Sequence, residues 1–182
     1  MKKNIFYLSI LLFFTFIFTI FYIGLGKPNF YKPKEVKNKN LEEFISTELF
    51  SNKQFNSKDI IENNNFTLIN IWSSWCVPCR SEHAILMNLS KKTDLNLVGL
   101  NYKDKKNNAI KFLDELGNPF SKNLIDPDGI ISISLGAYGV PESFLLNNKS
   151  LVIRKYIGPL TSDNILEILS ISEETLLATV SF

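Results

Sequence analysis

The chain has 182 residues, of which 45% are hydrophobic and 21% charged, and this balance is typical of one globular domain with additional segments rather than of a disordered chain. Its formal charge is only +2, from 20 basic and 18 acidic residues, which argues against a nucleic-acid partner. Two cysteines are too few for a disulfide-stapled scaffold or a four-cysteine zinc site.

The first segment is predicted to be a membrane anchor. Residues 4–26 carry no charged side chain, and at about 1.5 Å per residue they can cross a hydrocarbon core of ~30 Å. A cleaved signal peptide has a shorter apolar region, of roughly 7–15 residues, although Gly24 and Gly26 would satisfy a cleavage site. We therefore assign residues 1–26 to a single-pass signal anchor, and cleavage remains an alternative.

The orientation of this anchor is ambiguous in the sequence. Five lysines between residues 27 and 39 follow it and two precede it, and a count of basic residues alone would place the rest of the chain in the cytoplasm. Residues 27–46 are rich in Lys, Asn and Pro and show no apolar periodicity before Leu41. They are predicted to be a juxtamembrane tether.

The remaining chain alternates between predicted strands and helices. A hairpin over 47–50 and 54–56 is followed by a brief helix that Ser57 caps. The apolar run 66–72 predicts a strand buried on both faces. The later elements expected are a helix over 78–89, a strand over 95–102, a helix over 108–116 that ends at Gly117, a short strand over 120–125, a turn at 126–129, a short helix over 130–135, a hairpin over 143–146 and 151–156, and a helix from about 162 to about 169.

This order of elements predicts an α/β domain with a mixed central sheet over residues 47–170. No element is predicted for the tail, residues 171–182.

The sequence Trp75-Cys76-Val77-Pro78-Cys79 lies between a predicted strand and a predicted helix, which is typical of a thioredoxin-like redox motif. Cys76 would lie at the helix N-terminus, where free N–H groups and the helix dipole stabilise a thiolate, so it is the expected nucleophile. Cys79, one turn further on, would resolve the mixed disulfide. The alternatives are a structural disulfide, a buried inert pair, or a zinc site that also uses His83.

Two neighbouring titratable residues follow the cysteines. Glu82 lies one turn after Cys79 on the same helix face and could accept its proton, but it could equally be a solvated helix acid. His83, the only histidine, is seven residues from Cys76, and we predict a surface position for it rather than a Cys–His pair.

A proline before a strand, as in Gly139-Val140-Pro141-Glu142, requires a special backbone. A cis Val140–Pro141 bond would open the backbone of Val140 to an extended peptide.

Together, these stretches resemble the membrane-anchored thiol–disulfide oxidoreductases of cytochrome c maturation, the CcmG/DsbE type. The resemblance covers roughly Thr47 to Leu160. It rests on the stretches 75–83, 99–104 (Gly-Leu-Asn-Tyr-Lys-Asp), 116–119 (Leu-Gly-Asn-Pro) and 136–145 (Gly-Ala-Tyr-Gly-Val-Pro-Glu-Ser-Phe-Leu).

The resemblance implies a thioredoxin fold with an added N-terminal hairpin and a central insertion, and a redox-active disulfide between Cys76 and Cys79. It implies a cis Pro141 that faces the cysteines and an acidic groove to which Glu82 and Glu142 contribute. No cofactor and no metal are expected. The residues expected to bind substrate are Trp75, Tyr138, Val140, Pro141 and Glu142.

The resemblance also implies that the domain lies in the periplasm, on a bacterial inner-membrane anchor. The expected partners are apocytochrome c or its haem-ligation components, and a membrane electron donor of the DsbD/CcdA type. Val140 stands where the family often has Ala, which adds bulk beside the peptide-binding backbone. Rival functions are a TlpA/ResA-like reductase for copper sites or general thiols and a module that only holds apocytochrome. Carboxylates near Cys76 argue against an oxidising, DsbA-like role, because they disfavour the stabilised thiolate of a strong oxidant.

Overall fold

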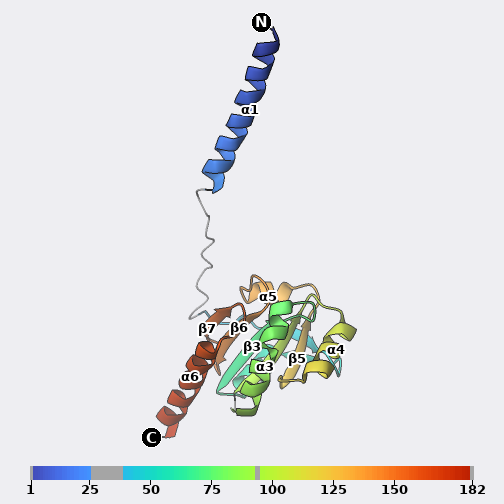
Figure 1. Ribbon diagram of the computed structural model, residues 1–182. Coiled ribbons are helices and arrows are strands. Elements are labelled where there is room, and N and C mark those ends of the chain that lie inside the picture. Colours follow the sequence, from blue (N-terminus) through green and yellow to red (C-terminus); the bar gives the residue numbers. More distant parts are fainter. Residues whose placement is uncertain (1, 26–38, 93–94, 181–182) are drawn as a thin grey trace. The chain divides into compact units, whose positions relative to one another are not determined.

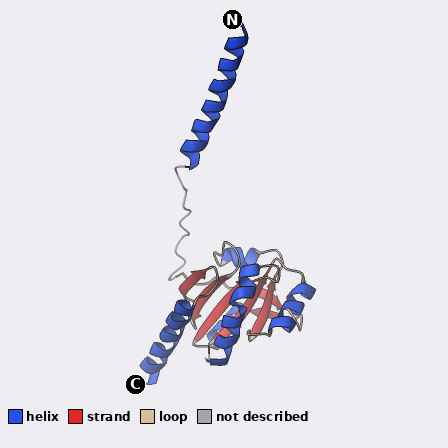
Figure 2. Ribbon diagram, viewed as in Figure 1, coloured by secondary structure: helices blue, strands red, loops and turns tan. Residues whose placement is uncertain are grey.

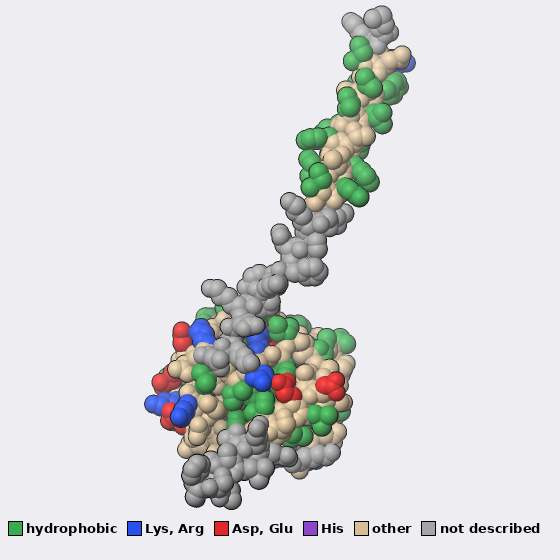
Figure 3. Space-filling view, turned by 90° about the vertical axis from the view of Figure 1, so that its left-hand side faces the viewer, with side chains coloured by type: hydrophobic (Ala, Val, Ile, Leu, Met, Phe, Trp, Pro, Cys, Tyr) green, Lys and Arg blue, Asp and Glu red, His purple; other side chains and the backbone are tan. Residues whose placement is uncertain are grey.

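The computed structural model describes residues 2–25, 39–92 and 95–180, and the chain divides into two units, residues 1–35 and 36–182. The described part of the first unit is one long helix, α1 (Lys2–Leu25). Hydrophobic side chains project from α1 along the part that Figure 3 shows, and every described side chain of α1 is exposed. The span Lys3–Gly24, with a mean hydropathy of 2.3, is long and apolar enough to cross a membrane. Most of the expected tether, residues 27–38, lies outside the described residues.

The second unit is built on a mixed sheet of seven strands in the order β2-β1-β5-β4-β3-β6-β7. Strands β3, β4 and β5 are parallel, and all other neighbours pair antiparallel. The mixed α/β architecture predicted from the sequence is therefore confirmed. The strands are β1 (Ile45–Glu48), β2 (Gln54–Asn56), β3 (Phe66–Trp72), β4 (Asn96–Tyr102), β5 (Lys122–Asp126), β6 (Glu142–Asn147) and β7 (Val152–Ile157).

Helices cover both faces of the sheet (Figures 1 and 2). Because successive side chains of a strand point to opposite faces, Leu68 and Trp72 enter one hydrophobic core and Ile69 and Ile71 the other. The first core also contains side chains of α3 (Val77–Lys92), α4 (Lys106–Leu116) and α6 (Ser162–Val180). The second core contains side chains of α2 (Ser57–Glu62) and Leu135, the residue that follows α5 (Ile130–Ser134).

The order of elements is that of a thioredoxin fold with additions. A β3-α3-β4 unit and a β6-β7-α6 unit form the two halves of the fold. Between them lie α4, β5 and α5, which place one more strand in the sheet and match the expected central insertion. The β1–β2 hairpin pairs with β5 and extends that edge, as expected for the N-terminal hairpin.

Asn56 rather than Ser57 caps α2, because the Asn56 side chain accepts the N–H of Lys58. Two boundaries of the domain also differ from the sequence-based expectation. The domain begins before residue 47, because the N–H of Leu41 donates to Ser150 O (2.8 Å) and the N–H of Val152 donates to Lys39 O (3.0 Å). These bonds join residues distant in the sequence, so no local pattern could indicate them. Helix α6 continues to Val180 through the tail to which no element was assigned. Its sequence contains neither Gly nor Pro, so nothing ends the helix near residue 169.

Candidate active site

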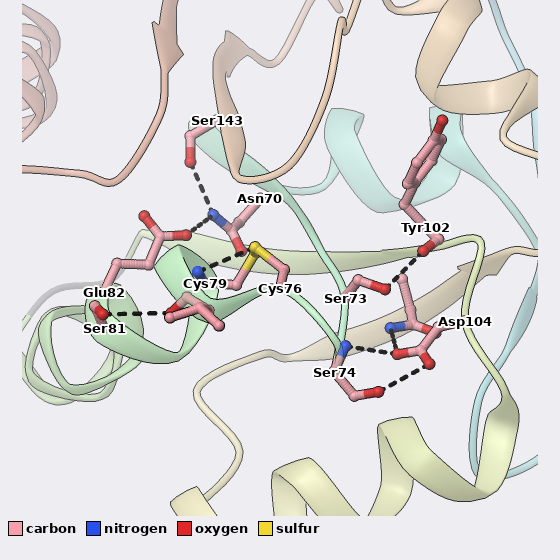
Figure 4. The surroundings of a disulfide bond; sticks show 12 residues. Asn70, Ser73, Ser74, Cys76, Cys79, Ser81, Glu82, Tyr102, Asp104 and Ser143 are labelled. Atoms are coloured by element: carbon pink, nitrogen blue, oxygen red, sulfur yellow. Dashed lines mark hydrogen bonds between the residues drawn. A yellow bond between two sulfur atoms is a disulfide. The ribbon is translucent and has the colours of Figure 1, made fainter.

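Cys76 and Cys79 form a disulfide where strand β3 leads into helix α3 (Figure 4). Their Cα atoms are 5.3 Å apart, and the N–H of Cys79 donates to Cys76 Sγ over 3.1 Å. Both cysteines are almost fully buried, at 3% and 2% exposure, whereas the flanking Trp75 and Val77 are 57% and 76% exposed. Burial therefore does not distinguish the two sulfurs, but only Cys76 receives a backbone N–H of the first helical turn.

The loop that precedes Cys76 is held by Asp104. Its carboxylate accepts hydrogen bonds from the N–H and hydroxyl of Ser74, over 2.6 and 2.8 Å, and from the side chain of Asn101, over 3.1 Å. Beside it, Trp75 Nε1 donates to Lys103 O over 3.0 Å. The segment after β4 thus fixes the approach to the cysteines, and it orients the exposed Trp75 ring.

Glu82, one turn after Cys79 on α3, is buried at 1% exposure. Its Oε1 accepts a hydrogen bond from Asn70 Nδ2 (3.0 Å) and its Oε2 from the N–H of Leu160 (2.8 Å). Burial raises the pKa of the Glu82 carboxyl above its ordinary value, and these two hydrogen bonds offset part of that rise. The alternative of a solvated helix acid is therefore wrong, because the face of α3 that carries Glu82 packs on the sheet.

His83 is also buried, at 4% exposure, so the predicted surface position is wrong. Its Nε2 donates to Gly117 O over 2.8 Å, and its ring lies edge-on to Phe112. Burial lowers the pKa of His83, the bond to Gly117 opposes that change, and the charge of Arg80 adds to the lowering. The histidine faces the core beside the insertion, so it does not join the cysteines in the zinc site considered above.

Glu142 does not line an acidic groove, and this corrects the expectation from the resemblance. The side chain is 2% exposed, and Lys155 Nζ lies 2.9 Å from its Oε2. Its Oε1 accepts the N–H groups of Tyr138 and Gly139, over 2.8 and 3.1 Å. Glu82 is buried as well, so neither of the two carboxylates lies on the surface beside the disulfide.

The loop before β6 contains a cis peptide bond between Val140 and Pro141, the isomer that the resemblance implied. Pro141 is buried and Val140 half-buried, packed against both cores. Tyr138 is 47% exposed, and Lys155 Nζ lies 4.0 Å from the centroid of its ring. Through Tyr138 and Gly139, Glu142 holds the backbone that leads into the cis bond, so it shapes the loop rather than presenting its own charge.

Sequence reasoning missed several residues of the site. Asn70 and Ser143 pair across β3 and β6, and Asn70 Nδ2 also donates to Ser143 Oγ over 3.0 Å. Asn70 carries the only carboxamide in the run 66–72, which is expected to be a fully buried strand, and this interruption was the available signal. Asp104 and Lys155 carried no such signal, because their partners lie 30 and 13 residues away.

The chain matches the Redoxin family over residues 37–169. It is 46% identical over 101 residues to the thiol:disulfide interchange protein CycY of Rhizobium leguminosarum bv. viciae, covering 56% of this chain and 54% of that protein. It is 34% identical over 128 residues to the thiol:disulfide interchange protein DsbE of Allochromatium vinosum, covering 70% of each. The chain spans little more than half the length of several of these relatives, including DsbE of Escherichia coli, of which it covers 57% at 40% identity.

Solved structures agree on the fold. A putative DsbE from Chlorobium tepidum superimposes with a TM-score of 0.61 at 24% identity, covering 78% of this chain and 96% of that one. A DsbF homologue from Corynebacterium diphtheriae gives a TM-score of 0.65 at 22% identity, covering 79% and 95%. The fold and the Cys-x-x-Cys site define a thioredoxin-like protein. The chain belongs to the Redoxin family, and within it to the CcmG/DsbE type.

Proposed function

We propose that this protein is a membrane-anchored thiol–disulfide oxidoreductase that reduces disulfides in the haem-attachment pathway of apocytochrome c. The observation that carries the redox activity is the Cys76–Cys79 disulfide at the start of α3, with the buried carboxylate of Glu82 one turn below it. The names of the CycY and DsbE relatives support thiol–disulfide exchange, and the cytochrome substrate rests on the resemblance to their type.

In the reduced protein, Cys76 is the attacking thiol. The N–H of Cys79 already points at its sulfur over 3.1 Å, and the helix N-terminus favours negative charge there, so both effects stabilise the Cys76 thiolate. The thiolate attacks a sulfur of the substrate disulfide, and the other substrate sulfur leaves as a thiol after taking up a proton. A mixed disulfide between Cys76 and the substrate results.

Cys79 then resolves the mixed disulfide. Its thiol gives a proton to the Glu82 carboxylate, and the Cys79 thiolate attacks Cys76 Sγ. The Cys76–Cys79 bond forms, the bond from Cys76 to the substrate breaks, and the second substrate sulfur leaves with its electron pair. The substrate gains two electrons, and a membrane donor of the DsbD/CcdA type would return this protein to the dithiol.

Substrate binding is assigned to the exposed surface around the disulfide. The exposed Trp75 next to Cys76 would contact the substrate, and we assign the exposed Tyr138 and the backbone of Val140 and Pro141 to binding of an extended peptide. The oxidised Cys-x-x-Cys-His segment of an apocytochrome is such a peptide. The domain would lie in the periplasm, with α1 in the inner membrane.

Trapping tests the assignment of the two cysteines. Cys79→Ser should accumulate a covalent adduct with apocytochrome c, since the resolving thiol is gone, and Cys76→Ser should form none. The measurement is non-reducing electrophoresis of the full chain from cells, with the double variant as the control. An adduct with Cys76→Ser alone would reverse the roles, and an adduct only with copper-site proteins would favour the TlpA/ResA-like alternative.

A reporter fused after Phe182 tests the topology. A reporter that is active only in the periplasm should be active at this junction, although the basic residues after α1 would favour the opposite orientation. Activity of a cytoplasmic reporter there would overturn the localisation and, with it, the cytochrome substrate.

A further inference from the structure

Asn70 of β3 is completely buried, at 0% exposure, and Figure 4 shows it beside the cysteines. Its Nδ2 donates two hydrogen bonds, to Glu82 Oε1 and to Ser143 Oγ, each over 3.0 Å. Both hydrogens of the amide nitrogen are therefore used. In Figure 4, the nitrogen of the carboxamide lies on the side of Glu82 and Ser143, and its oxygen lies on the side of the cysteines.

The oxygen of this carboxamide is unusual. Among the described residues, Asn70 Oδ1 is buried without accepting a hydrogen bond. A buried acceptor that is left unpaired costs roughly 1–3 kcal/mol, and a site with this cost calls for an explanation. The amide cannot be turned over while Glu82 is ionised, because Oδ1 would then face a carboxylate oxygen.

Reduction of the disulfide creates a donor on this side of Asn70. A disulfide has no hydrogen to donate, whereas the Cys79 thiol has one. We propose that Asn70 is a positioning residue for the resolving step: Nδ2 holds the Glu82 carboxylate, and Oδ1 accepts the thiol hydrogen of reduced Cys79. The carboxamide would thus hold the proton donor and the proton acceptor of that step in register. This inference rests on the proposed function, because it assigns a partner to the proton transfer from Cys79 to Glu82.

The other charged groups near α3 are accounted for. Glu142 precedes Ser143 on β6, so its side chain points to the opposite face of the sheet, where Lys155 pairs with it. His83 is bonded to Gly117 O, and Arg80 pairs with Glu115 on α4. Leu160 supplies the remaining contact to Glu82 with its backbone N–H, which none of the variants below removes.

The role predicts two titrations that move in opposite directions. Asn70→Ala removes a donor to the Glu82 carboxylate, so the pKa of Glu82 should rise further. It also removes the acceptor that favours the protonated thiol, so the pKa of Cys79 should fall. A general loosening of the core would instead admit water and move the Glu82 pKa down, toward its ordinary value.

The experiment uses the full chain in detergent. Glu82 is titrated by nuclear magnetic resonance of its carboxyl, assigned by comparison with Glu82→Gln. Cys79 is titrated through its thiolate absorbance in a Cys76→Ser background, where it is the only thiol. The rate of the resolving step at neutral pH is measured separately. Asn70→Ala should lower it roughly tenfold, because the thiol and the carboxylate are no longer held in position; the two pKa shifts alone would favour the transfer.

The chain offers a matched control in Asn123 on β5. It is also a buried asparagine, at 3% exposure, and its Oδ1 likewise accepts no hydrogen bond among the described residues, but its Nδ2 donates to Asn118 rather than to an acid. Asn123→Ala should leave both titrations unchanged. Asn70→Leu fills the site with an apolar side chain of similar size and should reproduce the effects of Asn70→Ala, so a poorly folded alanine variant would not end the test.

The outcomes distinguish the positioning role of Asn70 from the catalytic role of Glu82. Opposite shifts together with a slower resolving step support both the role of Asn70 and that of Glu82. If both shifts occur but neither Asn70→Ala nor Glu82→Gln changes the rate, Asn70 positions Glu82, and the catalytic role of Glu82 is wrong. If either titration stays unchanged in both Asn70 variants, or matches Asn123→Ala, the inference is overturned.

Discussion

Two glutamates of this domain are almost equally buried, yet their surroundings differ in one respect. Glu142, at 2% exposure, has a lysine ammonium 2.9 Å from its carboxylate. Glu82, at 1% exposure, has only neutral donors, the amide of Asn70 and the N–H of Leu160. The buried Glu142 carboxylate therefore meets a cation, whereas the buried Glu82 carboxylate meets only neutral dipoles.

This difference assigns the two glutamates different roles, Glu142 a structural one and Glu82 a chemical one. Glu142 and Lys155 hold the loop that carries Tyr138 and the cis Val140–Pro141 bond. Glu82 lies one turn from Cys79, and burial raises the pKa of its carboxyl above the ordinary value, which favours a role in proton transfer. The predictions below test this division from the largest expected effect to the smallest.

The largest effect is expected for Glu82→Gln on the resolving step. Loss of the proton acceptor should slow this step by about 10²–10⁴-fold, the usual contribution of general-base catalysis. The measurement is the single-turnover release of a peptide from a preformed mixed disulfide on Cys76. Glu115→Gln, an exposed acid of α4, is the control. Equal rates for the two variants would reduce Glu82 to a structural residue.

Lys155→Met should give the largest loss of stability. Removal of the cation leaves the Glu142 charge buried and unpaired, which typically costs about 3–5 kcal/mol. Lys111→Met is the matched control, because Lys111 pairs with Glu115 at 79% exposure and such a pair contributes about 0–1 kcal/mol. Urea unfolding at neutral pH measures both. Similar midpoints for the two variants would mean that the Glu142–Lys155 pair does not hold the loop.

The pH dependence of stability should carry a contribution from Glu82. Its pKa is raised in the folded state from an ordinary value of 4.5, so the folded state binds this proton more tightly. The contribution of Glu82 to stability is fully present below pH 4.5 and is lost as the pH rises through the pKa of the folded state. Glu82→Gln should remove this decline, as measured by unfolding at a series of pH values. An unchanged profile would contradict the raised pKa.

The smallest effect on the pH dependence of stability is expected from His83, and it has the opposite sign to that of Glu82. Its pKa is lowered from 6.5, so its contribution is present above 6.5 and is lost as the pH falls through the folded pKa. His83→Gln should flatten this acid-side loss and leave the decline due to Glu82 in place. The same unfolding series measures it, and a steeper acid-side loss in the variant would show that His83 is charged in the folded protein.

Much of the fold was predictable because its signals are local. The apolar run that became β3 and the glycine that ends α4 lie within their own elements, so the strand and helix were placed within a few residues. The Cys-x-x-Cys pair is local too, since its spacing places both sulfurs on one helical turn. The surface position predicted for His83 was wrong because exposure depends on which face of α3 meets the sheet.

The sequence by itself determined the apolar N-terminal helix, the order of strands and helices, and the redox pair, because each depends on residues close together in the chain. Only the tertiary structure decided the surroundings of Glu82, and with them the direction in which its pKa is shifted. Glu82 meets Leu160, 78 residues away, and Asn70 meets Ser143, 73 residues away, across the packed layers. A carboxylate takes its pKa from desolvation and neighbouring dipoles, and these exist only once distant segments have packed around it.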